Sequence, residues 1–371
     1  MVGILISSVV LTAGSLSAGD VVGSALAPQL LDRVSSSSTV AVVSTSVKFE
    51  SSNPAACHYQ SCFTLQRTSD NGATFTTGSL PAVAVAVVNG SLLGDIRDVI
   101  FASQDDGFIL QGSGPVTTLK VTVDGAKTWH SERIAPNVSI VDFTTTHHEL
   151  YAVIAHCAAN GRCTDYRIAR SPLTANHWTF TPLATWPSGM GVGLGAYGSH
   201  VWLTQQTHAT VLVYASDDQG RTFTRSSAPM LGSVYACSIT AKSTIVLWAE
   251  CPTGMSVSFF YSRDGGVRWN RIPVTQFAGT GGGAFDPVSS TIGYLEYGPS
   301  DTPGTKNLYR ITDDGRTMTP VGTLACNIVN GLVFTDEMHG LAACDRSNTQ
   351  ATTYLLRTSD GGATWKRVNL T

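Results

Sequence analysis

The sequence has few charged residues and no long run of charge. Asp, Glu, Lys and Arg make up 13% of the 371 residues, which is well below the usual share of roughly 25%. The formal net charge of −3 gives none of the basic character that nucleic-acid-binding proteins carry. We therefore expect no nucleic acid among the partners of this protein.

Short motifs of several enzyme classes are also missing. The chain has no phosphate-binding G-x-x-x-x-G-K-[ST] loop, no Gly-rich dinucleotide fingerprint before a helix, no H-E-x-x-H and no G-x-S-x-G nucleophile motif. Its eight cysteines include no C-x₂-C pair and no compact Cys/His cluster of the kind that binds zinc. We predict neither a cofactor nor a metal site.

What the sequence does have is a repeated turn. Residues 358–365 read T-S-D-G-G-A-T-W between two strand-like runs. The glycines permit the positive φ angles of a tight reversal, and the aspartate can accept hydrogen bonds from backbone N–H groups of its own turn. The copies of this turn, two of them degenerate, end at Phe75, Trp129, Trp178, Phe223, Trp269, Thr319 and Trp365.

The spacing of these copies indicates the fold. They follow one another at intervals of 45 to 54 residues. A repeat of roughly 40–50 residues that contains several short strands is typical of a β-propeller blade. The sequence therefore predicts an all-β, seven-bladed β-propeller of four-stranded antiparallel blades over residues 39–371.

The pattern S/T-x-D-x-G-x-T-W/F resembles the Asp-box, or BNR repeat. It occurs in sialidases, sortilin-type receptors, xyloglucan-processing glycoside hydrolases and photosystem II assembly/stability factor-like proteins. The chain looks most like the last group, through its D-G-G-x-T-W turn and single-propeller length. In these families the box is a structural turn between the third and fourth strands, away from the ligand face, so the resemblance implies fold more than function. It assigns the structural aspartates to Asp70, Asp124, Asp218, Asp264, Asp314 and Asp360.

The N-terminal residues suggest export. Residues 1–19 are apolar and small, with no charge before Asp20, and they resemble the hydrophobic region of a secretory signal peptide. A retained membrane-anchoring segment and a first β-strand packed on the propeller are the alternatives. Residues 20–38 end in four serines and are expected to be a linker. We predict a secreted or cell-envelope protein, with membrane association through the N-terminal segment left open.

The cysteines fall into four adjacent pairs, each of which brackets a predicted reversal. Cysteines placed symmetrically about a turn face each other across a hairpin, at a distance that a disulfide can span. We predict four within-blade disulfides, which belong in an oxidising compartment. The pairs are Cys57/Cys62, Cys157/Cys163, Cys237/Cys251 and Cys326/Cys344.

The four pairs fall toward the face opposite the repeated turns, where the longer loops also lie. Irregular loops on a rigid scaffold commonly bind ligands. The ligand-binding candidates on this face are Arg97, Asp98, His156, Trp186, Asp345 and Arg346. Each also has a plain alternative, as a solvated charge, a structural histidine or a buried tryptophan.

Two carboxylates and a tyrosine are the catalytic candidates. Glu250, Glu296 and Tyr297 lie near strand ends, and a pair of carboxylates about 5–10 Å apart would suit glycoside hydrolysis. Convergent arginines beside them would favour an enzyme, and an aromatic, carboxylate-poor face would favour a binding protein.

We favour a non-catalytic binding or assembly module for a protein or glycan partner. The alternatives are a sialidase-like glycoside hydrolase acting on extracellular glycans and a purely structural surface protein. The sequence shows no strand shared between its two ends that would close the ring, and it predicts no particular oligomeric state.

Overall fold

A computed structural model of the chain describes residues 26–33, 40–46, 63–81, 85–88, 91–94, 96–112, 117–158, 162–183, 191–206, 210–226, 230–231, 236–252, 257–273, 283–297, 304–345 and 353–368. Residues 1–19, Cys57, Cys62, Trp186 and Arg346 lie outside these ranges, as do the side chains of Arg97 and Asp345. The predictions made for them stay predictions.

The secondary structure of the described ranges consists of β-strands joined by turns. The first strands are β1 (Leu26–Arg33), β2 (Val40–Ser46), β3 (Phe63–Thr68), β4 (Thr76–Gly78), β5 (Val85–Val88), β6 (Ser91–Gly94), β7 (Ile96–Phe101), β8 (Gly107–Gln111), β9 (Thr118–Thr122) and β10 (His130–Glu132). They are followed by β11 (Ser139–Thr145), β12 (Glu149–Cys157), β13 (Cys163–Pro172), β14 (Thr179–Pro182), β15 (Val192–Tyr197), β16 (His200–Gln206), β17 (Thr210–Ser216), β18 (Thr224–Arg225), β19 (Met230–Leu231) and β20 (Ser238–Ala241). The remaining strands are β21 (Leu247–Pro252), β22 (Val257–Ser262), β23 (Asn270–Arg271), β24 (Phe285–Pro287), β25 (Gly293–Glu296), β26 (Lys306–Thr312), β27 (Thr317–Leu324), β28 (Ile328–Phe334), β29 (Gly340–Asp345), β30 (Thr353–Thr358) and β31 (Lys366–Val368).

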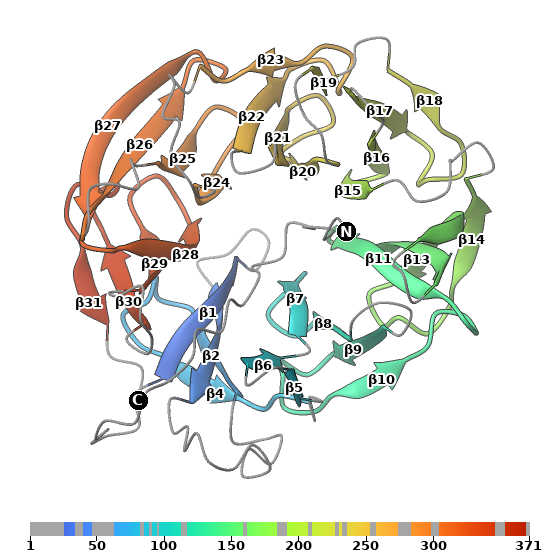
Figure 1. Ribbon diagram of the computed structural model, residues 1–371, viewed down its shortest axis with the longest axis horizontal. Coiled ribbons are helices and arrows are strands. Elements are labelled where there is room, and N and C mark those ends of the chain that lie inside the picture. The colour runs from blue at the N-terminus through green and yellow to red at the C-terminus, as the bar shows by residue number, and fades with distance from the viewer. Residues whose placement is uncertain are drawn as a thin grey trace.

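Consecutive strands pair antiparallel into meander sheets, and the sheets stand around a ring (Figure 1). The first strand of each sheet lies nearest the centre, and neighbouring first strands contact one another, such as β1 with β7 and β11 with β15. Apolar side chains fill the space between facing sheets. The all-β propeller fold predicted from the repeat is confirmed.

The prediction of seven four-stranded blades is wrong. Within the described ranges the structure has six four-stranded blades, formed by β1–β4, β7–β10, β11–β14, β20–β23, β24–β27 and β28–β31. The sheet of β15–β18 has a fifth strand, β19, which pairs with β17, and β5 and β6 form a separate two-stranded sheet. The repeated turn marks one hairpin per sheet, so it cannot reveal strands added by the connections between sheets.

Both additional features arise in connections between sheets, where the sequence analysis predicted no strands. Met230 and Leu231 pair with Val211 and Thr210, and a strand of two residues leaves no periodic pattern in the sequence. In contrast, β5 and β6 flank Asn89-Gly90, a dipeptide that commonly forms a two-residue hairpin.

The first blade starts earlier than the sequence analysis expected. Strand β1 lies inside residues 20–38, the segment expected to be a linker, and it pairs with β2 from Leu26↔Ser46 to Arg33↔Val40. The eight residues of β1 are therefore part of the first blade, and β1 contacts β28, β29 and β30 of the last one.

The repeat turns form hydrogen-bonded loops with the geometry that their residue types suggest. In the first turn, Asp70 Oδ1 accepts from Thr68 Oγ1 (2.7 Å), from Ala73 N (2.9 Å) and from Thr74 N (2.9 Å), while Asp70 Oδ2 accepts from Thr74 Oγ1 (2.6 Å). Gly72 closes the turn with φ +80° and donates to Thr68 Oγ1. These hydrogen bonds, led by that from Thr74, lower the pKa of Asp70 to about 2.

The same arrangement recurs in other copies. The Thr128 hydroxyl holds the pKa of Asp124 well below its usual range, and the Thr364 hydroxyl lowers that of Asp360 to about 2. The degenerate copy that ends at Thr319 differs, because its Asp314 instead pairs with Arg263 of the preceding sheet at 2.6 Å.

The repeat turns lie at the same end of their sheets as the first-to-second turns. Gly125 N donates to Asp105 O, Gly265 N to Ile245 O, and Gly361 N to Met338 O. We call this end of the ring the repeat-turn face. The second-to-third turns lie at the opposite end of the strands, which we call the disulfide face.

Candidate functional site

Three disulfides fix strand ends on the disulfide face. Cys157–Cys163 joins β12 to β13. Each of the other two joins a cysteine just before the first strand of a blade, β20 or β28, to a cysteine in the second strand of that blade, β21 or β29. The Cα–Cα distances are 4.0, 4.2 and 5.3 Å. Three of the four predicted pairings are therefore confirmed: Cys157–Cys163, Cys237–Cys251 and Cys326–Cys344. They are consistent with an oxidising, extracellular environment.

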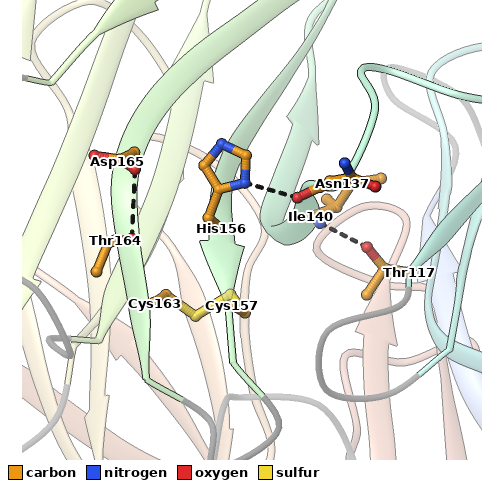
Figure 2. Close-up of a disulfide and its surroundings, with 8 residues drawn as sticks. All are labelled: Thr117, Asn137, Ile140, His156, Cys157, Cys163, Thr164 and Asp165. Carbon is orange, nitrogen blue, oxygen red and sulfur yellow. Dashed lines mark hydrogen bonds between the residues drawn. A yellow bond between two sulfur atoms is a disulfide. The ribbon is translucent and has the colours of Figure 1, made fainter.

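The candidate site on this face surrounds Cys157–Cys163 (Figure 2). We call Asn137, His156, the two cysteines and Asp165 the disulfide-hairpin site. Asn137 belongs to the connection that enters β11, whereas the other four belong to the hairpin of β12 and β13. Asn137 and Asp165 both have φ +56°, a left-handed conformation that costs energy in residues other than glycine. The hairpin register shifts between Ile154 and His156.

His156 connects the hairpin to the neighbouring connection. Its Nδ1 lies 2.7 Å from the carbonyl oxygen of Asn137 (Figure 2). A carbonyl oxygen can only accept, so Nδ1 must carry the proton, and Nε2 of the neutral ring is then a hydrogen-bond acceptor. The half-buried imidazole is thus held in one orientation and one tautomer. The exposed carboxylate of Asp165 adds a negative charge on the adjacent strand.

Asp98, another predicted ligand residue, occupies the position in its blade that Asp142 occupies in the next one. Each follows a register shift in a first strand, and each accepts a hydrogen bond at 2.8 Å from the N–H of the next residue. Asp142 Oδ2 also accepts from Leu194 N of the next sheet at 2.8 Å. At Asp142, then, this position links neighbouring sheets, which gives Asp98 a structural alternative to ligand binding.

Loss of contact with water dominates the electrostatics of the two candidate catalytic glutamates. Burial raises the pKa of Glu250 to about 7 and that of Glu296 to about 7. Glu296 is 3% exposed, and its Oε2 accepts from Ala284 N at 3.3 Å. A carboxyl group with a pKa near neutrality could act as a general acid.

These two carboxyl groups do not face a common space. Alternate residues of a strand point to opposite sides of its sheet. Glu250 is on the side of Trp248, which packs against Leu295 and Tyr297 of the next sheet. Glu296 is on the side of Tyr294, which packs against Phe334 of the β28–β31 sheet. The β24–β27 sheet therefore stands between Glu250 and Glu296, while Tyr297 lies on the Glu250 side.

The sequence analysis missed Asn137 and Thr117. Thr117 Oγ1 accepts from Ile140 N at 2.6 Å, which fixes the start of β11 (Figure 2). Pro136-Asn137 is a turn signal that could have drawn attention to Asn137. Its contact with His156 joins residues 19 positions apart in the sequence, so no local pattern could have indicated it.

The described ranges contain neither a candidate membrane span nor a candidate metal site. No helix there is long and apolar enough to cross a membrane. No group of three or more His, Cys, Asp or Glu side chains there could hold a metal ion.

Comparison with known proteins supports the fold. No family model and no curated protein matches the chain. Among solved structures, it is similar to YCF48 bound to D1 peptide, with 15% identity, coverage of 78% of this chain and 84% of that chain, and a TM-score of 0.51. It is also similar to a puromycin-hydrolyzing peptidase of Mycobacterium tuberculosis, with 12% identity, coverage of 93% and 52%, and a TM-score of 0.58. The chain thus spans about half the length of that peptidase.

A third similar structure is the β-propeller domain of the Trilobed protease from Pyrococcus furiosus, described as having an open velcro topology. It has 10% identity, coverage of 93% of this chain and 98% of that chain, and a TM-score of 0.56. At such identities these similarities establish a β-propeller and no particular activity.

Proposed function

We propose that the protein is an exported or cell-envelope propeller that binds a protein partner, without catalysis, through its disulfide face. The observation that carries the proposal is the placement of three disulfides at this one end of the strands. Cross-links that fix strand ends pre-organise the adjoining surface, which lowers the entropy cost of binding. A glycan is the alternative partner.

The disulfide-hairpin site supplies the recognition chemistry in this proposal. His156 Nε2 would accept a hydrogen bond from an N–H or O–H group of the partner, and Asp165 would attract a positive charge. YCF48, one of the similar structures, was solved with a bound peptide, which is a precedent for a protein ligand on this fold.

A matched pair of variants tests the proposal. His156→Ala removes the ring on the disulfide face, and His148→Ala removes an exposed ring on the repeat-turn face. Proteins captured from the extracellular fraction by the wild-type chain would be purified, and their dissociation constants measured with each variant. We expect His156→Ala to weaken binding about tenfold and His148→Ala to leave it unchanged. Equal affinity of both variants would show that the partner does not use this site.

The sialidase-like alternative draws support from the raised pKa values of Glu250 and Glu296. Their separation by a sheet weighs against a carboxylate pair made of these two. Incubation of the wild-type chain with a fluorogenic sialoside tests this alternative. Turnover that is lost in Glu250→Gln would replace the binding proposal with an enzyme. Export is tested separately, by the N-terminal sequence of the protein recovered from the medium.

A further inference from the structure

A pocket of about 350 Å³ lies where the first and last blades meet, on the repeat-turn side of the ring. One wall is the first repeat turn, at Gly72 and Ala73. The other is formed by β30, β31 and the turn between them, including Arg357, Ser359, Thr364 and Lys366. We call it the seam pocket. Ligand pockets commonly have volumes of this order.

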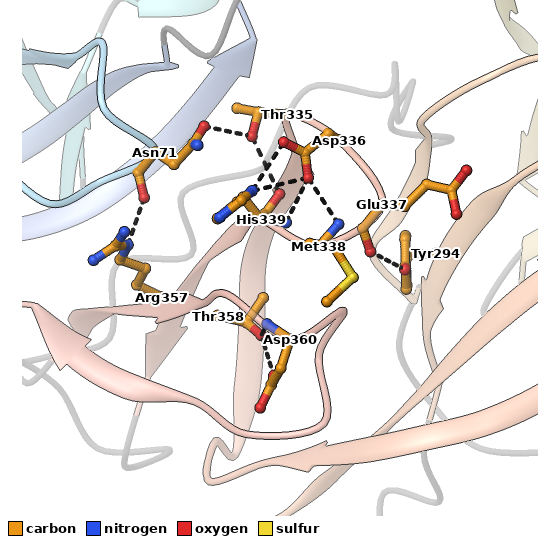
Figure 3. Close-up of polar contacts among 10 residues, drawn as sticks. All are labelled: Asn71, Tyr294, Thr335, Asp336, Glu337, Met338, His339, Arg357, Thr358 and Asp360. Atoms are coloured by element: carbon orange, nitrogen blue, oxygen red, sulfur yellow. Dashed lines mark hydrogen bonds and ion pairs between the residues drawn. The ribbon is translucent and has the colours of Figure 1, made fainter.

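Two positive side chains belong to the same wall. Arg357 and Lys366 are direct cross-strand partners in the β30–β31 pairing, so they point to the same side of the sheet. Arg357 Nε donates to Asn71 O at 2.7 Å across the seam (Figure 3). In the part of the chain that the structure describes, neither cation forms an ion pair with a carboxylate. Like charges in such positions repel each other unless an anion lies between them.

The corresponding positions of other blades are arranged differently. Arg67 and Arg170 also precede a repeat turn, but their cross-strand partners are Thr76 and Thr179. Each threonine hydroxyl donates to the carbonyl of its arginine, at 3.3 and 3.4 Å. The last blade thus has a lysine where these two blades have a threonine.

The counter-charge is also missing from the last blade. The carboxylate of Glu149 lies 3.8 Å from the Arg170 guanidinium. Glu149 comes just before Leu150, which pairs with Ser171, the first residue of that blade's repeat turn. In the last blade the equivalent residue is His339, because the next residue, Gly340, pairs with Thr358 at the start of the turn. His339 forms an ion pair with Asp336 (Figure 3). Arg357 and Lys366 therefore form a positive pair that the other two blades lack.

We propose that the seam pocket binds the oxyanion of a phosphate-bearing small molecule, held by Arg357 and Lys366. Ion-pair hydrogen bonds from both cations would offset their mutual repulsion, and the exposed Ser359 hydroxyl is a further donor. Asp70 and Asp360 adjoin the pocket through Ala73 and Thr364, but their oxygens accept hydrogen bonds inside their own turns. The site lies on the face opposite the disulfides and does not depend on the proposed function.

Calorimetric titration of the full chain at constant ionic strength tests the site. The probes are inorganic phosphate, a sugar phosphate and acetate. Lys366→Thr introduces the residue that the blades of Arg67 and Arg170 have at this position. Arg225→Thr is the matched control, because it removes an exposed cation from the outer strand of another blade. We expect saturable phosphate binding that weakens about tenfold in Lys366→Thr and is unchanged in Arg225→Thr.

Thermal unfolding provides the second measurement. Without phosphate, Lys366→Thr should melt at the same temperature as the wild type or higher, because it removes a like-charge contact. Added phosphate should raise the melting temperature of the wild type and of Arg225→Thr, but much less that of Lys366→Thr. Non-saturable binding by the wild type, or equal losses in both variants, would overturn the proposal. Acetate binding as tight as phosphate binding would overturn the choice of phosphate, and a sugar phosphate that binds more tightly would identify an ester rather than the free ion as ligand.

Discussion

Carboxyl groups of this protein occur in two opposite environments. The repeat-turn aspartates accept several hydrogen bonds each, and these lower their pKa values. Glu250 and Glu296 lie within the sheets, and burial raises their pKa values to about 7. Hydrogen-bond donors outweigh desolvation in the first group because the turns leave their carboxylates in contact with water.

Asp70→Ala should destabilise the protein by about 1 kcal/mol at neutral pH, because it removes the acceptor of four hydrogen bonds in one turn. The folded-state pKa lies below the unfolded one, so this contribution is present above about pH 4 and is lost as pH falls toward 2. Urea unfolding at several pH values measures it. Asp217→Ala, at an exposed position of another repeat turn, is the control and should change little. An Asp70→Ala effect of equal size at pH 2 would contradict this explanation.

Glu296 should make the wild type less stable as pH rises, opposite to Asp70, and Glu296→Gln should remove this effect. The folded-state pKa of Glu296 is near 7 and the ordinary value is 4.5, so the folded protein binds this proton more tightly. The wild type should therefore lose up to about 3 kcal/mol as pH rises from about 4.5 to above 7. The glutamine variant should be free of this loss and more stable than the wild type at pH 8. Parallel pH profiles for the two proteins would show that Glu296 is not protonated in the folded state.

At the scale of strands, close approach between sheets depends on small residues. A Cβ atom at Gly193 of β15 would lie 2.0 Å from the carbonyl oxygen of Cys237, just before β20. That carbonyl accepts from Thr204 Oγ1 at 2.6 Å, and Cys237 is held by its disulfide. The backbone there cannot withdraw without breaking these contacts.

Gly193→Ala should consequently destabilise the protein by about 2 kcal/mol or more, through overpacking against fixed backbone. Gly191→Ala is the matched control two residues away. Its new methyl group would meet the end of the flexible Gln206 side chain, which can move aside. Guanidinium unfolding of both variants gives the comparison, and equal destabilisation would mean that the sheets adjust more freely than their contacts suggest.

The same strands show how much the sequence could predict. The repeat turn predicted the propeller and the face on which the cysteines lie, because both follow from residues close together in the chain. It did not predict β19, whose two residues pair with a strand about 20 positions earlier, or β1, which lies in a Ser-rich segment. Glu250 and Glu296 were correctly placed near strand ends. Their opposite orientations depend on which neighbour each strand face packs against, and no local pattern contains that information.

For the molecule as a whole, no sheet of the described ranges combines strands from the two ends of the chain. The first blade contains only strands from the start of the described chain, and the last blade only strands from its end. Side chains join the two. Phe75 packs against Val333, Leu341 and Leu355, and Thr335 Oγ1 donates to Asn71 Oδ1 at 2.8 Å (Figure 3). Together with the contacts of β1 to β28, β29 and β30, these side chains hold the first and last blades together.

Thr335→Val should loosen this seam and little else. It removes the hydroxyl that donates to Asn71 and that also lies 3.3 Å from His339 O in its own turn, while keeping the shape of the side chain, at a cost of about 1 kcal/mol. Thr146→Val is the matched control, since Thr146 holds the same position after β11 but bonds only within its own turn. Hydrogen exchange should become about fivefold faster in Thr335→Val at amides of both β3 and β30, which are far apart in sequence. In Thr146→Val the change should stay near residues 146–149. Faster exchange in β30 without any in β3 would mean that the hydroxyl stabilises its own blade and does not hold the two ends of the chain together.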